Sequence, residues 1–208
     1  MQLTSQTFVD NTYMPDECAF GLLNPDKQYR WGPNRNPAFS WSGLPTGTRS
    51  LAMINDDLDV PTRLDTFNKE GLTVAKDLPR RTLCHWVLVD IRPDDAIAFG
   101  EYSDGVTVGG KPGPRGLRGA REGVNEYGDW FRNDATMKGD YYGYDGPCPP
   151  WNDDRPHRYV FTLYALDIPR LGVEGTFDKY QALDAMQGHV LGESSLTGLF
   201  TLNAALTG

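Results

Sequence analysis

Two histidines and two neighbouring aspartates are the residues of this 208-residue chain whose types and spacing could do chemistry together. His85 and His157 each stand near the beginning of a segment typical of a β-strand, and Asp57 and Asp59 follow an apolar run. Because the aspartates are two residues apart, their side chains would share one face of an extended strand. Beside two imidazoles, these carboxylates would form a polar pocket able to bind a phosphate-like group. In the alternative interpretation, the aspartates form a turn before Pro61 and hydrogen-bond only the backbone.

A loop rich in proline and glycine leads into His157 and would complete this pocket. Within residues 143–157 the prolines fix φ and remove N–H donors, whereas Gly143 and Gly146 allow backbone conformations that other residues avoid. The remaining N–H groups would be held in one arrangement, and such an arrangement suits an anion.

Other chemistries use the same residues. His85, His157 and one of the two aspartates could form a two-histidine, one-carboxylate metal site, but no HxH, HxD or HExxH spacing supports it, and we expect neither a metal nor a cofactor. Cys148 could be a nucleophile with His157 as its base, or a small apolar filler between two prolines. The third histidine, His189, follows a helix stop at Gly188, where an imidazole interacts favourably with the helix dipole and needs no further role.

The elements expected to position these residues are mainly strands. Alternating or apolar runs predict strands over residues 38–42, 50–55, 83–91, 158–166 and 190–202. Apolar residues recurring every third position predict one helix over 177–187, with Thr176 as its N-cap. Residues 1–36, 62–81 and 92–140 are expected to be loops with little regular structure. The fold class is therefore all-β with a few peripheral helices.

Composition limits the class of protein. The length and the 39% hydrophobic content predict a single domain over residues 1–208. With 20 Lys and Arg against 28 Asp and Glu, the formal charge of −8 argues against nucleic acid and anionic membrane surfaces as partners. The three cysteines lie far apart and form no CxxC pair, which favours a reducing, cytoplasmic location. We also expect no signal peptide and no membrane-spanning segment, because the N-terminus lacks a basic and then apolar region and no long apolar run occurs.

Three short motifs follow one another in the chain: Asp57-Leu-Asp59-Val-Pro61, then His85-Trp86, then Gly146-Pro-Cys148-Pro149-Pro150 followed by His157-Arg-Tyr159. Segments around residues 36–41, 47–50, 164–167 and 188–191 accompany them, so the pattern covers nearly the whole chain. This order of motifs resembles the phosphatidylethanolamine-binding protein family, most closely its bacterial, Raf kinase inhibitor-like branch.

The resemblance implies an antiparallel β-sandwich with peripheral helices and a small anion pocket at one end. The ligand-binding residues that it implies are Asp57, Asp59, Pro61, His85, Trp86, Gly146, Cys148, Pro149, Pro150, His157 and Tyr159. Cys148 departs from the eukaryotic members, which resemble Gly there, and this departure, with the segments 62–81 and 92–140, puts eukaryotic ligand preferences and kinase partners in doubt.

From these observations we expect a binding protein for phosphate or for a phosphorylated, phospholipid-headgroup-like ligand. In this hypothesis His85, His157 and backbone N–H groups near Cys148 hold the oxyanion, Tyr159 donates a hydrogen bond, and the carboxylates orient the imidazoles. One rival hypothesis is an interaction protein that regulates a kinase or another partner through the loop surface. A second rival is an enzyme that uses His157 as acid or base, or Cys148 as nucleophile. The resemblance also suggests a homodimer.

Overall fold

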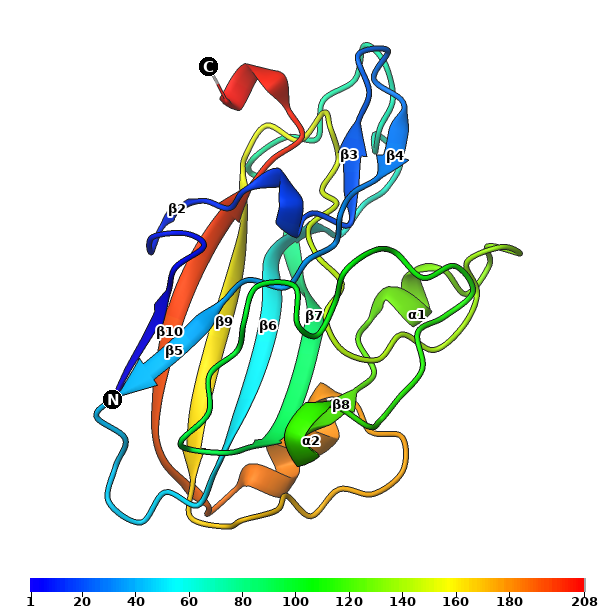
Figure 1. Ribbon diagram of the computed structural model, residues 1–208. Helices are drawn as coiled ribbons and strands as arrows, with labels where there is room; N and C mark the ends of the chain where they lie inside the picture. The colour runs from blue at the N-terminus through cyan, green and yellow to red at the C-terminus, as the bar shows by residue number, and fades with distance from the viewer. Residues whose placement is uncertain (208) are drawn as a thin grey trace.

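An antiparallel sheet forms the centre of the molecule in the computed structural model, which describes residues 1–207. Its long strands are β6 (Ser50–Pro61), β7 (Arg80–Ile91), β9 (His157–Leu166) and β10 (Val190–Phe200). Two short strands, β2 (Thr12–Tyr13) and β8 (Arg121–Gly123), complete the order β2-β10-β9-β6-β7-β8, in which β2 alone pairs in parallel. Figure 1 shows the long strands running side by side through the molecule.

Each face of the sheet has its own apolar core. The strand β9 places Tyr159, Phe161 and Leu163 on one face, as its period of two requires. This face is covered by the antiparallel pair β1 (Gln2–Ser5) and β5 (Phe39–Ser42), together with long loops. The opposite face packs against α2 (Lys179–Met186) and the segment before it. The β-rich fold class is thus confirmed, and the second layer is a two-stranded sheet extended by coil.

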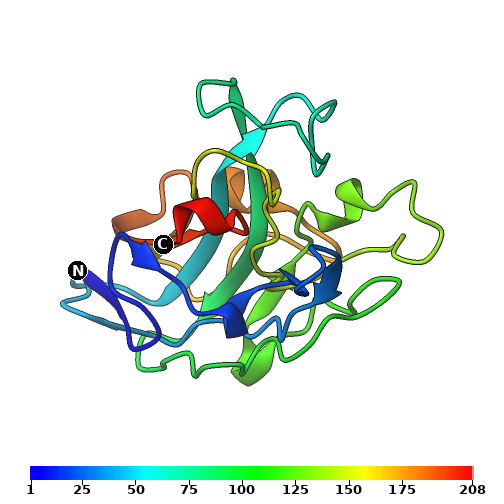
Figure 2. The ribbon, with the colours of Figure 1, turned by 90° about the horizontal axis from the view of Figure 1, so that it is seen from above.

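The N-terminal region contains more regular structure than expected. Besides β1 and β2, it forms the short helix η1 (Asp16–Cys18) and a hairpin of β3 (Gly21–Leu23) and β4 (Tyr29–Trp31). The expectation of little structure before residue 37 was therefore wrong, because strands of two to four residues carry no readable period. The connection between β6 and β7 is a loop, as expected, and it projects from one side of the molecule (Figure 2).

The other boundaries differ in detail from the expectations. The connection after β7 contains η2 (Leu117–Gly119), β8 and α1 (Tyr127–Trp130), and the chain ends with η3 (Ala204–Leu206). The helix α2 is capped by Asp178, whose carboxylate accepts from Gln181 N–H in a capping box, so the prediction of Thr176 as N-cap was wrong. Among residues 1–207, none of the helices has the length and apolar character needed to cross a membrane.

Candidate functional site

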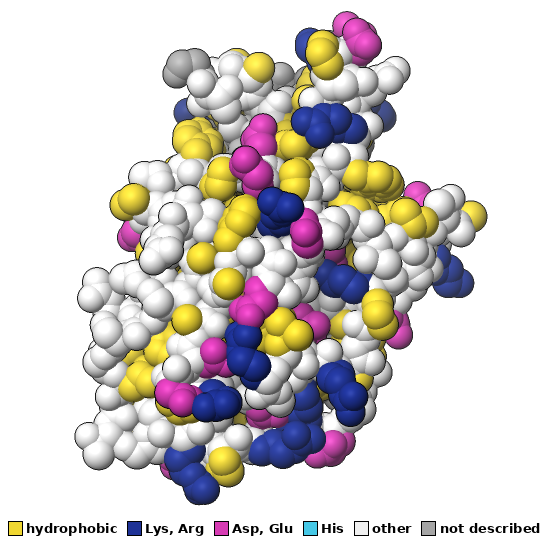
Figure 3. Space-filling model, viewed as in Figure 1, with side chains coloured by type: hydrophobic (Ala, Val, Ile, Leu, Met, Phe, Trp, Pro, Cys, Tyr) yellow, Lys and Arg dark blue, Asp and Glu magenta, His cyan; other side chains and the backbone are white. Residues whose placement is uncertain are grey.

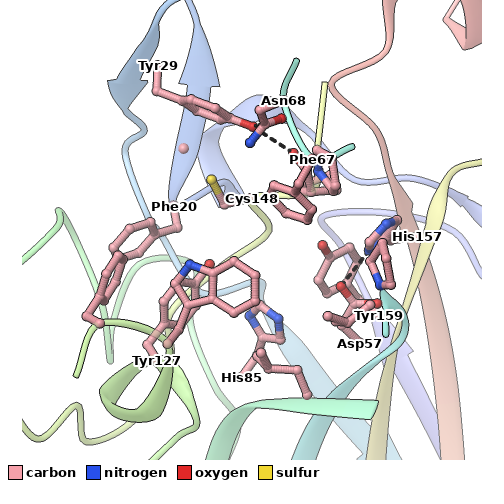
Figure 4. Close-up of a pocket in the computed structure, with 18 of the residues that line it drawn as sticks. Phe20, Tyr29, Asp57, Phe67, Asn68, His85, Tyr127, Cys148, His157 and Tyr159 are labelled. Atoms are coloured by element: carbon pink, nitrogen blue, oxygen red, sulfur yellow. Dashed lines mark hydrogen bonds and ion pairs between the residues drawn. The ribbon is translucent and has the colours of Figure 1, made fainter. Parts of the chain in front are cut away.

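A cavity of about 220 Å³ opens where β6, β7 and β9 meet the β3–β4 hairpin, α1 and the proline-rich loop (Figure 4). Five of its polar residues come from the motifs identified in the sequence, and we call them the polar floor: Asp57, His85, Cys148, His157 and Tyr159. Arg30 and Asn68 also line the cavity. Pro61, Pro149 and Pro150 also line the cavity. Residues that are up to a hundred positions apart in the chain are therefore brought together, as the sequence predicted.

Strand pairing places Asp57 beside His157. In the β6–β9 register Asp57 lies opposite Tyr159, which puts it diagonal to His157 on the same face. His157 Nδ1 lies 2.7 Å from Asp57 Oδ2, and His157 Nε2 lies 3.1 Å from Asp153 Oδ2. Because a carboxylate only accepts, both ring nitrogens carry protons and the imidazole is positively charged. Burial alone would lower the pKa of His157, but the two carboxylates outweigh it and raise the pKa to about 9.

Asp153 in turn is held by a cation. Arg80 Nη1 lies 2.6 Å from Asp153 Oδ2 and Arg80 Nη2 lies 3.0 Å from Asp153 Oδ1, so the pair is bidentate. Both side chains are buried. The two carboxylates and two cations of this group balance one another, and we call Asp57, Arg80, Asp153 and His157 the ionic cluster. Arg80 and Asp153 were missed by the sequence reasoning, although Asp153 lies in the loop that it singled out.

His85 has a different environment. Its Nδ1 lies 2.7 Å from the carbonyl oxygen of Asp145, and since a carbonyl only accepts, Nδ1 carries the proton. Burial lowers the pKa of His85, and the nearby acidic groups oppose this only in part, so the ring is neutral at pH 7. Its ring packs edge-to-face between Tyr127 and Tyr159, at 5.2 Å from each ring centre. Among the described residues, His85 Nε2 makes no hydrogen bond, and the ring lines the cavity.

The carbonyl that fixes His85 belongs to a well-anchored residue. The Asp145 carboxylate accepts from Asn34 Nδ2 at 2.8 Å and from Asn125 Nδ2 at 2.8 Å, and Lys111 Nζ lies 3.3 Å from it. The Asp145 N–H also donates to the carbonyl oxygen of His85 at 3.0 Å. These contacts hold the His85 ring in one orientation. The role of Asp145 could not be predicted from the sequence, because its partners Asn34, Asn125 and Lys111 come from distant loops.

Cys148 lines the cavity without the features of a nucleophile. Burial raises the pKa of its thiol to about 12, and the part of the chain that the structure describes offers this sulfur no hydrogen-bonded base. His157, the base considered for it, has both ring nitrogens bound to carboxylates. The loop packs so closely against β3 that a Cβ at Gly21 would lie 2.4 Å from Cys148 Sγ. Within residues 1–207 the Cys148 N–H has no hydrogen-bond acceptor.

Three of the residues implied by the resemblance do not line the cavity. The carboxylate of Asp59 bonds Arg158 Nε at 2.9 Å and lies 2.8 Å from Arg155, because a bulge between Asp57 and Val60 shifts the strand register. The expectation that both aspartates share one face was therefore wrong. The Asp59 N–H donates to Asp57 Oδ1 at 2.8 Å, so Asp57 makes the backbone hydrogen bond that the alternative expected, although within strand β6 and in addition to its bond with His157.

The other two residues that do not line the cavity, Trp86 and Gly146, pack in the protein interior next to it. Trp86 is fully buried and packs against Tyr102 and Tyr144 in the core. Gly146 is held by its backbone, where its N–H donates to Asn34 Oδ1 at 2.8 Å and its carbonyl accepts from the Tyr127 hydroxyl at 2.8 Å. A side chain at Gly146 would collide with the carbonyl of Cys18, with a Cβ only 1.8 Å from that oxygen.

The rest of the cavity is an aromatic wall that the sequence did not predict. It consists of Phe20, Tyr29, Trp31, Phe67, Tyr127, Trp130 and Phe131. Phe20 stacks on Tyr127 at 4.5 Å between ring centres, and Trp31 at the mouth is 53% exposed. Apolar side chains gather beside the β3–β4 hairpin on the face shown in Figure 3. No group of three or more His, Cys, Asp or Glu side chains within residues 1–207 is arranged to hold a metal ion.

Comparisons with known proteins agree with this fold and these motifs. The family model described as phosphatidylethanolamine-binding protein matches residues 4–201. The UPF0098 protein of Methanothermobacter thermautotrophicus is 36% identical over 169 residues, which cover 81% of this chain and 84% of that protein. The UPF0098 protein of Chlamydia muridarum is 30% identical over 200 residues, which cover 96% of this chain and 98% of that protein.

Solved structures give the same result. A phosphatidylethanolamine-binding protein homologue from Chlamydia trachomatis superposes with a TM-score of 0.62 at 28% identity, over 96% of this chain and 95% of that one. YbcL of Escherichia coli shares the fold, with a TM-score of 0.67 at 22% identity over 96% and 97% of the two chains. The resemblance read from the sequence motifs is confirmed, and the chain belongs to the phosphatidylethanolamine-binding protein family.

Proposed function

We propose that the cavity binds a small ligand with an anionic group and an apolar part, such as a phosphorylated or phospholipid-headgroup-like molecule. The single observation that carries the proposal is the division of the cavity into a polar floor and an aromatic wall. A ligand with two such parts would bury its apolar surface against the wall while its charged group meets the floor. The family description names phosphatidylethanolamine, a molecule with an anionic phosphate beside apolar chains, and so supports a ligand that has these two parts.

The floor offers an anion specific contacts although the chain carries a formal charge of −8. The charge of Asp57 is cancelled by the protonated His157, so the floor does not repel an anion through this carboxylate. The Cys148 N–H, free of partners among the described residues, can donate to an oxyanion. His85 contributes its free Nε2. The roles of the two histidines therefore differ from the sequence-based hypothesis: His85 contacts the ligand, whereas His157 positions the floor and has no N–H left to donate.

Calorimetry with two ligands tests the proposal. The wild-type protein should bind phenyl phosphate more tightly than inorganic phosphate, because only the ester reaches the aromatic wall. Phe67→Ala should weaken binding of phenyl phosphate several-fold and leave inorganic phosphate unchanged. His85→Gln should weaken both, and His189→Gln serves as a matched control, since His189 pairs with Asp167 outside the cavity. Absence of binding of both ligands to the wild-type protein at millimolar concentration would refute the proposed function.

Several expectations from the sequence remain predictions. These are a protein partner such as a kinase, the homodimer and the cytoplasmic location. The geometry disfavours the pair of Cys148 and His157 as a nucleophile and its base, because the thiol is protonated at pH 7 and the imidazole has no free nitrogen.

A further inference from the structure

We infer that the site selects an oxyanion that still carries a proton, such as a phosphate monoester in its singly charged form, and disfavours a phosphate diester. This inference rests on the proposed function and names the ligand class of the same cavity. Its basis is the hydrogen-bonding capacity of the polar floor, in which the free histidine nitrogen accepts a hydrogen bond.

His85 is held in one tautomer by its hydrogen bond to the backbone of Asp145. The Asp145 carbonyl, 2.7 Å from Nδ1, can only accept, so the proton of the neutral ring resides on Nδ1. Nε2 then presents a lone pair to the cavity. Edge-to-face packing of Tyr127 and Tyr159 against the ring supports this orientation.

Most other polar side-chain atoms around the cavity already have hydrogen-bond partners within the protein. Both nitrogens of His157 are bound by carboxylates, and the Tyr127 hydroxyl donates to the Gly146 carbonyl. Asp57 is also engaged, through Oδ2 with His157 and through Oδ1 with the Asp59 N–H. His85 Nε2 is therefore left as an acceptor for a ligand, beside donors that include the Cys148 N–H, the Tyr159 hydroxyl and the Arg30 side chain.

Several acidic groups surround His85 and oppose the effect of burial on its pKa. The charges of Asp56 and Asp57 on β6 and of Asp145 in the loop all act to raise the pKa of the ring, and Tyr127 and Tyr159 pack against it from α1 and β9. The Asp57 and Asp145 carboxylates have their own cationic or amide partners, and so does Asp56, which pairs with Lys179. Burial is the largest influence on the ring and favours its neutral form.

A phosphate monoester matches this set of groups and a diester does not. The second pKa of a phosphate monoester is about 6, so near pH 7 a monoester can take up one proton on binding at modest cost, and its O–H can then donate to Nε2 while its other oxygens accept from the Cys148 N–H. A diester has no such proton. Its oxygens would face the lone pair of Nε2 unless His85 were protonated against the effect of burial.

The experiment compares two ligands that share a phenyl ring, phenyl phosphate and methyl phenyl phosphate, by calorimetry of the wild-type protein from pH 6 to pH 9. At pH 7 we expect the monoester to bind at least tenfold more tightly than the diester. Because the complex holds one proton more than the separate partners above pH 7, the affinity for the monoester should fall about tenfold per pH unit there. Buffers of different ionisation enthalpy should report the uptake of about one proton.

The variants separate this inference from the proposed function. A glutamine at position 85 can both donate and accept, so His85→Gln should reduce the preference for the monoester to less than threefold and abolish proton uptake. His189→Gln should keep both. Equal affinity of the wild-type protein for the two esters, without proton uptake, overturns the selection of a protonated oxyanion and leaves the proposed function standing. Failure of both esters to bind overturns both.

Discussion

His85 and His157 occupy similar places in the fold and are in opposite states. Each lies in the first part of a long strand, each is almost completely buried, and both line one cavity. His157 faces two carboxylates and is charged, whereas Nδ1 of His85 faces a backbone carbonyl, and the ring is neutral. The bonding partner, rather than burial or position, therefore decides whether a buried histidine of this cavity is a cation held by carboxylates or a neutral ring with a free nitrogen.

The largest effect should come from removing a carboxylate of the ionic cluster. Asp153→Ala leaves Arg80 and His157 buried without a shared counter-charge, which should lower the free energy of unfolding by about 3–5 kcal/mol. Urea unfolding at pH 7 measures it. The control is Asp65→Ala, which removes an exposed partner of Arg63 and should leave the unfolding midpoint unchanged. Equal effects of the two substitutions would show that the ionic cluster does not stabilise the fold.

The next effect is the pH dependence of stability, which should differ in sign between the two histidines. The pKa of His157 is about 9 in the folded protein, above the ordinary value of about 6.5. Its contribution, about 3 kcal/mol, is therefore complete below pH 6.5 and lost as the pH rises to about 9. The pKa of His85 is lowered, so its effect appears as a loss of stability when the pH falls below about 6.5.

Urea unfolding of wild type and variants between pH 5 and pH 9.5 measures these slopes. His157→Gln should remove the decline between pH 6.5 and pH 9, and His85→Gln should make the acid decline shallower. Nitrogen-detected NMR of the ring signals provides a direct check, because the chain has only three histidines. Titration of His85 and His157 at the same pH would show that their bonding partners do not set opposite charge states.

Much of the fold could be predicted from the sequence, because its long strands carry a period of two. Residues 83–91 and 158–166 are apolar or alternating over enough positions to identify β7 and β9. The alternation of residues 38–42 also identified β5, but β1, β3 and β4 could not be predicted, since these strands of three or four residues show no clear period.

The site was predicted only in part. The sequence motifs and the family resemblance brought His85, His157 and Asp57 together correctly. The aromatic wall was missed because its members come from the β3–β4 hairpin, the loop after β6 and α1, with no pattern linking them. The opposite states of the two histidines were also beyond the sequence, since they depend on Asp145 and Asp153, whose orientation is set by contacts across the fold.

A smaller effect should follow from removing the ring that only contacts the backbone. His85→Gln loses one neutral hydrogen bond to the Asp145 carbonyl, so we expect the free energy of unfolding at pH 7 to fall by about 1 kcal/mol. Urea unfolding measures it beside His157→Gln, which removes a charged ring with two carboxylate partners and should cost about 2–3 kcal/mol. The reverse order of the two variants would show that burial outweighs the partner.

The smallest effect should come from Asp59, and it extends the comparison from the histidines to the aspartates. Asp57 bonds His157 in the floor, whereas Asp59 faces Arg155 and Arg158 outside the cavity. Asp59→Asn should therefore leave the affinity for phenyl phosphate within twofold of wild type, as measured by calorimetry. Asp57→Asn should lower that affinity more, because His157 loses one of the two carboxylates that keep it charged and oriented. If Asp59→Asn weakened binding as much as Asp57→Asn, the bulge after Asp57 would not separate the two carboxylates functionally.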